Sequence, residues 1–348
     1  MEEIGTLRIG SKDLKVYTKL KNSWKLSKKE FPNAIPVVKL FKAHNNLKTL
    51  IDTKDSKFLK GFVVNNEIKG ARINILPDGR KLDKAYSLFA DELIIHDETS
   101  NNHWDVLYKN KGGTYSYVYT LDKIKNAVTN KYKKEEEFEK YYPKLKKNVS
   151  FALKDKKDSL ALPMYTLLET NMRVGNEMYY KLHGHKGLTT LKKNDVSIKG
   201  ENVTFNYLAK DGVPMNVTKQ FPSDYIGRLS NVLKEKKKND FIFVGSNGHP
   251  LLDTQFKEAF KKYCGREFYP HMVRSYYATK KTEEFLEKHK KASKEEVKDL
   301  FLSIAEELGH KRFDKKENIW KDSYNVTIHH YIKPELVEKV KNLIKWKA

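Results

Sequence analysis

The sequence contains a single cysteine, Cys264, among 348 residues. One cysteine excludes an intramolecular disulfide and any zinc site built from several cysteines, so we expect a reducing, intracellular environment. No apolar run approaches the ~18 residues that a membrane span requires. The first ten residues, MEEIGTLRIG, lack the apolar core of a signal peptide. We therefore expect a protein that acts inside the cell and has no membrane partner.

Acidic residues are scarce relative to basic ones, with 45 Asp and Glu against 68 Lys and Arg, a net charge of +23. The basic excess is present in both halves of the chain. With 20 Tyr and 17 Phe interspersed, it indicates nucleic-acid binding. A solubilising lysine-rich surface is the alternative explanation of the charge alone.

The sequence shows no pair of carboxylates with the spacing of a two-metal site. The acidic cluster at residues 135–139 falls on consecutive helical positions, which do not converge on one ion. We therefore expect no metal ion and no other cofactor.

The chain is long enough for about two domains of ~150 residues, and its pattern changes near residue 124. Residues 1–124 are short alternating runs broken by turns, and Gly112-Gly113 between two such runs predicts a hairpin. Residues 121–157 are rich in Lys and Glu and predict a helix interrupted at Pro143. We expect an α+β protein: a β-rich N-terminal domain at 1–124 and a larger, mainly helical domain with a small hairpin sheet at 125–348.

Basic residues in the second domain occupy defined local positions. An apolar helix at 159–171 precedes Arg173, and strands at 201–208 and 213–221 flank Ala209-Lys210-Asp211-Gly212. Asp-Gly between alternating strands predicts a hairpin, with Lys210 at its tip. Residues 241–244 predict a buried strand. Taken alone, Arg173 and Lys210 are most simply explained as surface residues.

Two further helices position a second arginine and a histidine. A helix beginning at Pro270 carries His271 and Arg274 on neighbouring faces. The next helix opens with a capping box at Ser293 and closes at Gly309, so His310 projects just beyond a well-defined helix end. A hydrogen-bonded surface histidine is the default explanation for either histidine alone.

After a charged loop, an apolar-periodic segment carries Tyr331 in the string HHYIKPELV. A phenol, with a pKa near ~10, is a poor nucleophile unless cationic donors stabilise the charge that develops. This chain supplies such donors. Attack on a phosphodiester would give a phosphotyrosine ester, which conserves the bond energy and allows a broken strand to be resealed without ATP.

The ordered series Arg173, Lys210, Arg274, His310 and Tyr331 resembles the tyrosine recombinase and type IB topoisomerase superfamily. The strings MRVGNEMYY at 172–180, GLTTL at 187–191 and KDG at 210–212 are similar to the small topoisomerases of poxviruses, giant viruses and some bacteria. HMVRSYYAT at 271–279 and LGH at 308–310 are shared with recombinases, and YIKPEL at 331–336 resembles the tyrosine motif of type IB topoisomerases. The resemblance covers about residues 160–340 and is weak over the N-terminal domain.

The resemblance implies a type IB DNA topoisomerase that relaxes supercoils without ATP or metal. Tyr331 would form a 3′-phosphotyrosyl bond, Arg173, Arg274 and His310 would donate hydrogen bonds to the phosphate, and Lys210 would act as general acid. The residues implied as supporting DNA contacts are Tyr179, Thr190, Asp211 and His271. The N-terminal domain would complete a clamp around duplex DNA. The enzyme would act as a monomer, and a viral source would place it in the virion or the host cell.

Three features depart from the family pattern. Ala209 stands where relatives often have Gly, and Asn176 replaces a basic residue of the poxvirus relatives. His310 and Tyr331 are 21 positions apart, and the extra loop at 311–325 contains Tyr324, a rival nucleophile. The aliphatic residue and the proline that follow Tyr331 favour Tyr331.

Two other functions fit parts of the pattern. A site-specific recombinase would use the same five residues in a tetramer, but it needs partner-swapping segments, and 17 residues follow Tyr331. An architectural DNA-binding protein would bind DNA without ever forming a covalent adduct. We expect salt to weaken the binding steeply in every case.

Overall fold

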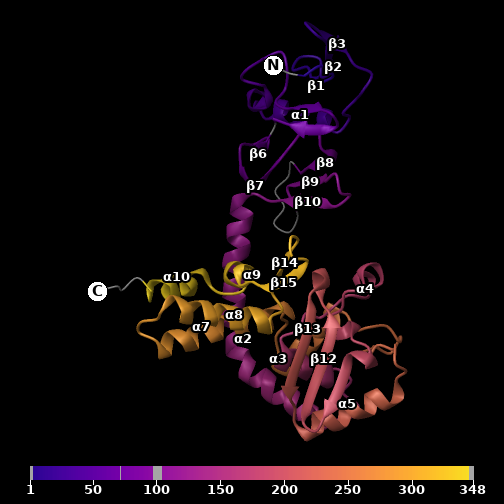
Figure 1. Ribbon diagram of the computed structural model, residues 1–348, viewed down its shortest axis with the longest axis vertical. Coiled ribbons are helices and arrows are strands. Elements are labelled where there is room, and N and C mark those ends of the chain that lie inside the picture. The colour runs from indigo at the N-terminus through magenta and orange to yellow at the C-terminus, as the bar shows by residue number, and fades with distance from the viewer. Residues whose placement is uncertain (1–2, 71, 97–103, 345–348) are drawn as a thin grey trace. The chain divides into compact units, whose positions relative to one another are not determined.

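The computed structural model describes residues 3–70, 72–96 and 104–344. The chain divides into two compact units, Met1–Lys131 and Tyr132–Ala348, and Figure 1 labels their elements. The first unit is rich in strands and the second is mainly helical with small sheets, which together make an α+β protein. In the described part of the chain, no helix combines the length and the apolar character needed to cross a membrane.

The described part of the first unit consists mainly of antiparallel strands that pack with helix α1. Its sheets have the orders β3-β2-β1-β4-β5, β10-β9-β8 and β6-β7. The predicted Gly112-Gly113 hairpin is confirmed, since β9 and β10 pair from Val106↔Val118 to Tyr115↔Lys109. The bounds are β1 Leu7–Ile9, β2 Val16–Lys19, β3 Trp24–Leu26, α1 Ala34–Ala43, β4 Phe62–Val64, β5 Glu67–Lys69, β6 Ile73–Ile75, β7 Lys81–Tyr86, β8 Asp91–Ile95, β9 Val106–Lys109 and β10 Tyr115–Val118.

Helix α2, Leu121–Ala152, continues through Pro143, so the predicted interruption is wrong. Proline removes one helical hydrogen bond and crowds the preceding turn, at a cost of about 3 kcal/mol. The helix buries Phe138 on one side of the proline and Leu145 and Val149 on the other, all fully inaccessible. Burial of each such side chain stabilises by roughly 1.5–3 kcal/mol, which offsets the cost of the proline.

The sheet β11-β12-β13 organises the next part of the second unit. Strands β12 and β13 pair in full register from Asn202↔Gln220 to Leu208↔Pro214, as the predicted hairpin requires. Alternate residues such as Val203 and Phe205 are fully buried in the core, which is the period-2 pattern of a half-buried strand. The bounds are α3 Ala161–Thr170, α4 Glu177–His183, β11 Val196–Lys199, β12 Asn202–Leu208, β13 Pro214–Gln220, α5 Ser223–Glu235 and α6 Asp253–Cys264.

The segment at 241–244 is buried but does not form a regular strand, which corrects the prediction. Ile242 and Phe243 are buried, and the segment pairs through isolated bridges of Phe241 with Lys192 and Val244 with Pro250. Its apolar residues fill the core, while its backbone lacks a continuous partner strand.

The last part of the chain packs helices around Phe301, Ile304 and Ile332. Helix α8 begins with the predicted capping box at Ser293, and Gly309 takes a left-handed φ of 66° just after the helix. Residues 311–325, expected as a charged loop, contain a hairpin closed by left-handed Asn318. Phe313 lies opposite Trp320 across this hairpin, and an aromatic cross-strand pair of this kind stabilises the pairing of two strands. The bounds are α7 His271–Lys288, α8 Lys294–Glu307, β14 Lys311–Asp314, β15 Ile319–Asp322, α9 Asn325–His330 and α10 Pro334–Asn342.

Candidate active site

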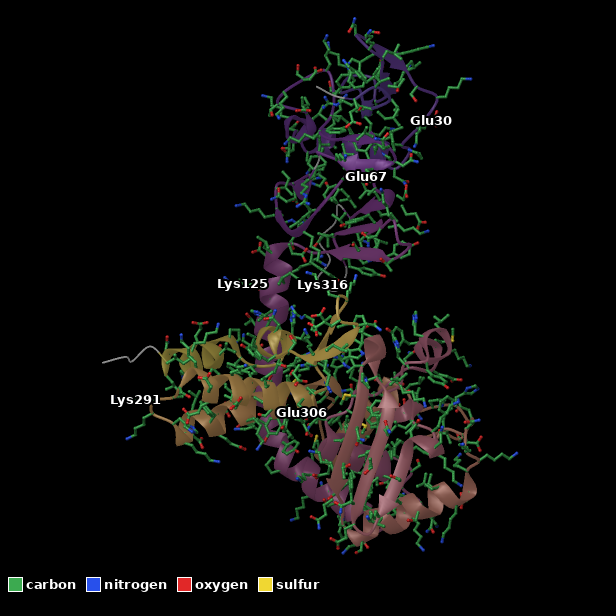
Figure 2. The ribbon with its side chains drawn as sticks, viewed as in Figure 1. Glu30, Glu67, Lys125, Lys291, Glu306 and Lys316 are labelled. Carbon is green, nitrogen blue, oxygen red and sulfur yellow. The ribbon has the colours of Figure 1, made fainter. Side chains whose placement is uncertain are left out.

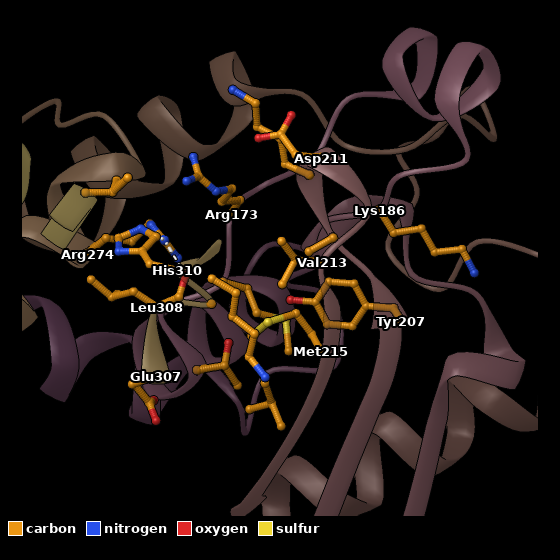
Figure 3. Close-up of a pocket in the computed structure, with 18 of the residues that line it drawn as sticks. Arg173, Lys186, Tyr207, Asp211, Val213, Met215, Arg274, Glu307, Leu308 and His310 are labelled. Atoms are coloured by element: carbon orange, nitrogen blue, oxygen red, sulfur yellow. Dashed lines mark hydrogen bonds between the residues drawn. The ribbon is translucent and has the colours of Figure 1, made fainter. Parts of the chain in front are cut away.

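A cavity of about 230 Å³ in the second unit collects four of the five predicted catalytic residues, all except Tyr331. Arg173 follows α3, Lys210 lies in the β12–β13 turn, Arg274 lies in the first turns of α7, and His310 follows α8. Figure 3 shows Arg173, Arg274 and His310 together on one side of the cavity, with Asp211 of the hairpin turn above it. Three basic side chains and an imidazole that are far apart in the sequence therefore share one opening.

Arg274 is held rigidly in the wall of this cavity. It is 2% exposed, and its guanidinium donates to the backbone oxygens of Asn171 and Leu308, the C-cap residues of α3 and α8. Burial lowers the pKa of Arg274, and the electrostatic interaction with Tyr331, together with a smaller contribution from their hydrogen bond, raises it. Two helix ends, and no carboxylate, thus hold the planar guanidinium in place. Its positive charge is therefore available to an anion.

Arg173 and Lys210 supply further positive charge. Across residues 3–70, 72–96 and 104–344, neither side chain has a hydrogen-bond or ion-pair partner. Arg173 lowers the pKa of both Arg274 and His310 by electrostatic repulsion. Positive charges grouped without acidic partners create a favourable site for an anion such as phosphate.

Tight glycine packing fixes the backbone at Arg173. Its carbonyl accepts a hydrogen bond from the Leu188 N–H at 2.8 Å. A Cβ placed on Gly187 would lie 2.6 Å from that carbonyl oxygen, so only glycine permits this close approach. The loop at 187–191 therefore positions the first arginine.

The turn that carries Lys210 has an unusual backbone. Asp211 and Gly212 have left-handed φ values of 63° and 80°, and Lys210 itself is exposed. This turn closes the β12–β13 hairpin, so the long lysine side chain extends from the end of a rigid pair of strands.

Acidic side chains in the cavity wall are Asp211 and Glu307. Glu307 accepts from Lys219 at 2.8 Å, so its charge is already compensated. Among the residues that the structure describes, no three His, Cys, Asp or Glu side chains gather in an arrangement able to hold a metal ion.

His310 is buried and neutral. Burial, followed by repulsion from Arg274 and Arg173, lowers the pKa of His310 to about 3. Its Nδ1 lies 2.8 Å from the Thr327 Oγ1, and its Nε2 lies 3.2 Å from the Arg274 Nη2. At neutral pH the ring is an uncharged hydrogen-bonding group.

The low pKa of His310 predicts a pH dependence of stability. The folded pKa lies below the ~6.5 of an unfolded histidine, so the folded state binds fewer protons and loses stability as the pH falls below 6.5. The loss is up to about 1.4 kcal/mol per pH unit. In urea unfolding between pH 6 and pH 4, we expect His310→Asn to lose less stability per pH unit than the wild type. The exposed control His44→Asn should follow the wild-type slope, and an equal slope in His310→Asn would contradict the prediction.

Tyr331 lies directly against this group. It is 3% exposed, its ring centre is 4.5 Å from that of His310, and the Arg274 Cζ is 5.3 Å from the ring centre. His271 packs against the same ring at 4.9 Å. The phenol therefore lies next to the cationic cavity, among two histidines and the buried arginine.

Helix α2 holds the backbone that follows Tyr331. The Tyr132 hydroxyl donates to the Ile332 oxygen at 2.7 Å, and the Lys333 Nζ lies 3.2 Å from the Glu136 Oε1. Ile332 is fully buried. These contacts restrict the movement of the tyrosine segment.

The rival tyrosine, Tyr324, has a different environment. Its ring centre is 5.8 Å from that of Phe301, and it packs against the core formed by α7, α8 and α10. Neither tyrosine lines the cavity that contains Arg173 and Lys210, but the Tyr331 ring packs against His310 and Arg274, whereas the Tyr324 ring packs against Phe301.

The predicted supporting residues lie in four different environments. Asp211 lines the cavity, and His271 lines a neighbouring cavity with Arg173 and Arg274. Tyr179 is half-buried on α4 and packs against His183 with ring centres 4.6 Å apart. Thr190 is fully buried, and its hydroxyl is used by Gly187, accepting from the N–H at 2.9 Å. Thr190 therefore faces the loop that positions Arg173 rather than the cavity.

Sequence reasoning missed several residues of this region. Tyr207 lines the cavity, where burial raises its pKa to about 12, and Lys311 and Trp320 of the β14–β15 hairpin also line it. Thr327 bridges His310 and Tyr331, because its hydroxyl contacts His310 and its carbonyl accepts the Tyr331 N–H at 3.0 Å. The position of Thr327, four residues before Tyr331 and so on the same helical face, is the signal that could have identified it.

Comparisons with known proteins agree on one family. The family model described as eukaryotic DNA topoisomerase I, catalytic core, matches residues 122–333. A DNA topoisomerase 1B of Acanthamoeba polyphaga mimivirus is 26% identical over 216 residues, which cover 57% of this chain and 64% of that protein. The chain thus spans slightly less than two thirds of that relative.

Two solved recombinase structures are distantly similar to this chain. The XerH site-specific recombinase bound to its difH substrate, in a pre-cleavage complex, is 20% identical over half of each chain, with a TM-score of 0.34. The XerA recombinase is 15% identical, covering 59% of this chain and 63% of that one, also with a TM-score of 0.34.

Proposed function

Because the chain belongs to the family of the eukaryotic DNA topoisomerase I catalytic core, we propose that it is a type IB DNA topoisomerase. It relaxes supercoiled DNA by cutting one strand, holding the end covalently, and resealing it. The reaction requires no ATP, since the covalent ester conserves the energy of the broken bond. It requires no metal ion, since the cationic side chains stabilise the charge on the phosphate. The name of the mimivirus relative supports the same activity.

The observation that carries this proposal is the set of cationic groups in the cavity beside Tyr331. In the proposed reaction the Tyr331 hydroxyl gives up its proton to water and its oxygen attacks a backbone phosphorus, forming a 3′-phosphotyrosyl bond as the bond to the 5′-oxygen breaks. Arg173 and Arg274, together with His310, donate hydrogen bonds to the non-bridging oxygens. Guanidinium groups suit this role because their forked donors match the geometry of phosphate.

Lys210 protonates the departing 5′-oxygen. The exposed hairpin tip supports this role, because a lysine on a rigid turn can reach a group bound in the adjacent cavity. Resealing of the strand reverses this cleavage step. The 5′-hydroxyl attacks phosphorus, the bond to Tyr331 breaks, and the proton of the hydroxyl returns to Lys210. The site residues of this proposal are therefore Arg173, Lys210, Arg274, His310 and Tyr331.

The remaining parts of the proposal concern DNA binding. The basic N-terminal unit forms the second half of a clamp around duplex DNA, with the catalytic unit as the first half. Asp211, His271 and Tyr179 contribute contacts near the target site, and the enzyme acts as a monomer inside the cell.

Plasmid relaxation tests this function. In buffer containing EDTA and no ATP, the protein should relax positively and negatively supercoiled plasmid of arbitrary sequence. A site-specific recombinase would leave plasmid without its target site unchanged, and an architectural protein would bind without forming a covalent adduct. Failure to relax either substrate, with binding intact, would exclude the topoisomerase.

A further inference from the structure

The hydrogen bonds of His310 determine which of its nitrogens carries the proton. The Arg274 Nη2 lies 3.2 Å from the His310 Nε2, and a guanidinium can only donate. The Nε2 must therefore accept, which places the single hydrogen of the neutral ring on Nδ1. The Nδ1–H then donates to the Thr327 Oγ1 at 2.8 Å.

The proposed reaction needs the opposite arrangement. To donate to a phosphate oxygen in the cavity, His310 must carry its hydrogen on Nε2. A doubly protonated ring could donate from both nitrogens, but burial and the repulsion from Arg274 and Arg173 lower the pKa of His310 to about 3 in the protein without DNA, so the ring is neutral when a phosphate enters. A neutral ring that donates from Nε2 has no hydrogen on Nδ1, so Nδ1 can only accept a hydrogen bond.

Thr327 is able to serve both arrangements. A threonine hydroxyl donates or accepts, and it changes between the two by rotating about its Cβ–Oγ bond. Thr327 is fully buried, so water does not replace its contact with His310. Its carbonyl accepts the Tyr331 N–H at 3.0 Å, which ties the same residue to the tyrosine.

We infer that Thr327 is a positioning residue that allows His310 to exchange tautomers when a DNA phosphate enters the cavity. In the free protein the Thr327 hydroxyl accepts from Nδ1–H. With phosphate bound, Arg274 donates to the phosphate, one proton leaves Nδ1, one arrives at Nε2, and the hydroxyl donates to Nδ1. The ring charge is zero in both states, because Nε2 takes one proton from solvent in the cavity that His310 lines and Nδ1 releases one. The released proton passes to solvent during the transient opening in which the Thr327 hydroxyl rotates. This inference rests on the proposed function.

Two substitutions at Thr327 separate the hydroxyl from the shape of the side chain. Thr327→Val has nearly the same volume and lacks the hydroxyl, whereas Thr327→Ser retains it. We expect Thr327→Val to slow single-turnover cleavage of a duplex oligonucleotide about tenfold or more, since a wrong tautomer removes a transition-state donor. Thr327→Ser should remain within about threefold of the wild type.

Thr282→Val provides a matched control. Thr282 is fully buried and its hydroxyl donates to the Ala278 oxygen of the same helix at 2.8 Å. This variant shows how the loss of a buried hydroxyl away from His310 affects the cleavage rate. It should cleave DNA at the wild-type rate. Thermal unfolding of all three variants establishes that each is folded.

Nitrogen NMR of protein labelled with ¹⁵N-histidine reads the tautomer directly. The His310 signals are assigned by their loss in His310→Asn. In Tyr331→Phe protein, which cannot cleave, the proton should lie on Nδ1 without DNA and on Nε2 with a duplex oligonucleotide bound. In the Thr327→Val background, the DNA-bound protein should not show the single Nε2-protonated form.

The outcomes distinguish this inference from the proposed function. If wild-type protein cleaves DNA and Thr327→Val cleaves equally fast, or if the tautomer is the same with and without DNA, the inference about Thr327 is wrong. If wild-type protein forms no covalent adduct with DNA at all, the proposed function itself fails.

Discussion

Tyr331→Phe is expected to abolish covalent attachment to DNA and plasmid relaxation. The substitution removes only the phenolic oxygen, and the ring keeps its packing against His310 at 4.5 Å and His271 at 4.9 Å. Because no bond to phosphorus can form without that oxygen, we expect a rate loss on the order of 10⁶, the size found when the nucleophile of a covalent enzyme is removed. A denaturing gel of protein mixed with a labelled suicide oligonucleotide measures the adduct.

Tyr324→Phe is the matched control for this experiment. The ring of Tyr324 packs on Phe301, whereas the ring of Tyr331 packs on His310, so this variant should form the adduct at nearly the wild-type rate. Peptide mapping of the wild-type adduct should recover the DNA on the peptide that contains Tyr331. The reverse result, with Tyr324→Phe inactive and Tyr331→Phe active, would reassign the nucleophile.

Lys210→Ala is expected to slow cleavage by roughly 10²–10⁴, the usual contribution of a general acid. The loss has a specific chemical signature. In a substrate whose leaving 5′-oxygen is replaced by sulfur, the leaving group departs as a stable thiolate and needs no proton. We expect this substrate to restore most of the Lys210→Ala rate, while it leaves the rate defect of Arg173→Ala largely unchanged.

Lys199→Ala controls for the loss of a basic side chain from the same sheet. Lys199 is exposed at the end of β11, and it does not line the cavity. Its variant should cleave both substrates at nearly wild-type rates. An equal loss on the oxygen and sulfur substrates in Lys210→Ala would show that Lys210 acts in binding or phosphate stabilisation instead of proton transfer.

Several helix ends and turns of this fold could be predicted from short-range sequence patterns. The capping box at Ser293, the glycine at position 309 and the Asp-Gly turn at 211–212 each specify local backbone geometry, and the structure has a helix start, a helix end and a hairpin there. The Pro143 prediction failed because local propensity opposed the helix while buried Phe138 and Leu145 held it together through long-range packing. The β14–β15 hairpin was also missed, because its charged residues gave no clear local signal for strands.

Chain order and local motif were enough to select Arg173, Lys210, Arg274, His310 and Tyr331 as candidates, since each belongs to a short segment with its own signature. Their electrostatic state depends on neighbours that are distant in sequence. Burial, followed by repulsion from Arg274 and Arg173, lowers the pKa of His310, and the two nitrogens of its ring contact Arg274 and Thr327, which are 36 and 17 residues away. The charge and the hydrogen bonds of His310 depend on groups within a few ångströms in space. Only the packing of α3, α7, α8 and α9 brings those groups together, so the sequence alone does not determine them.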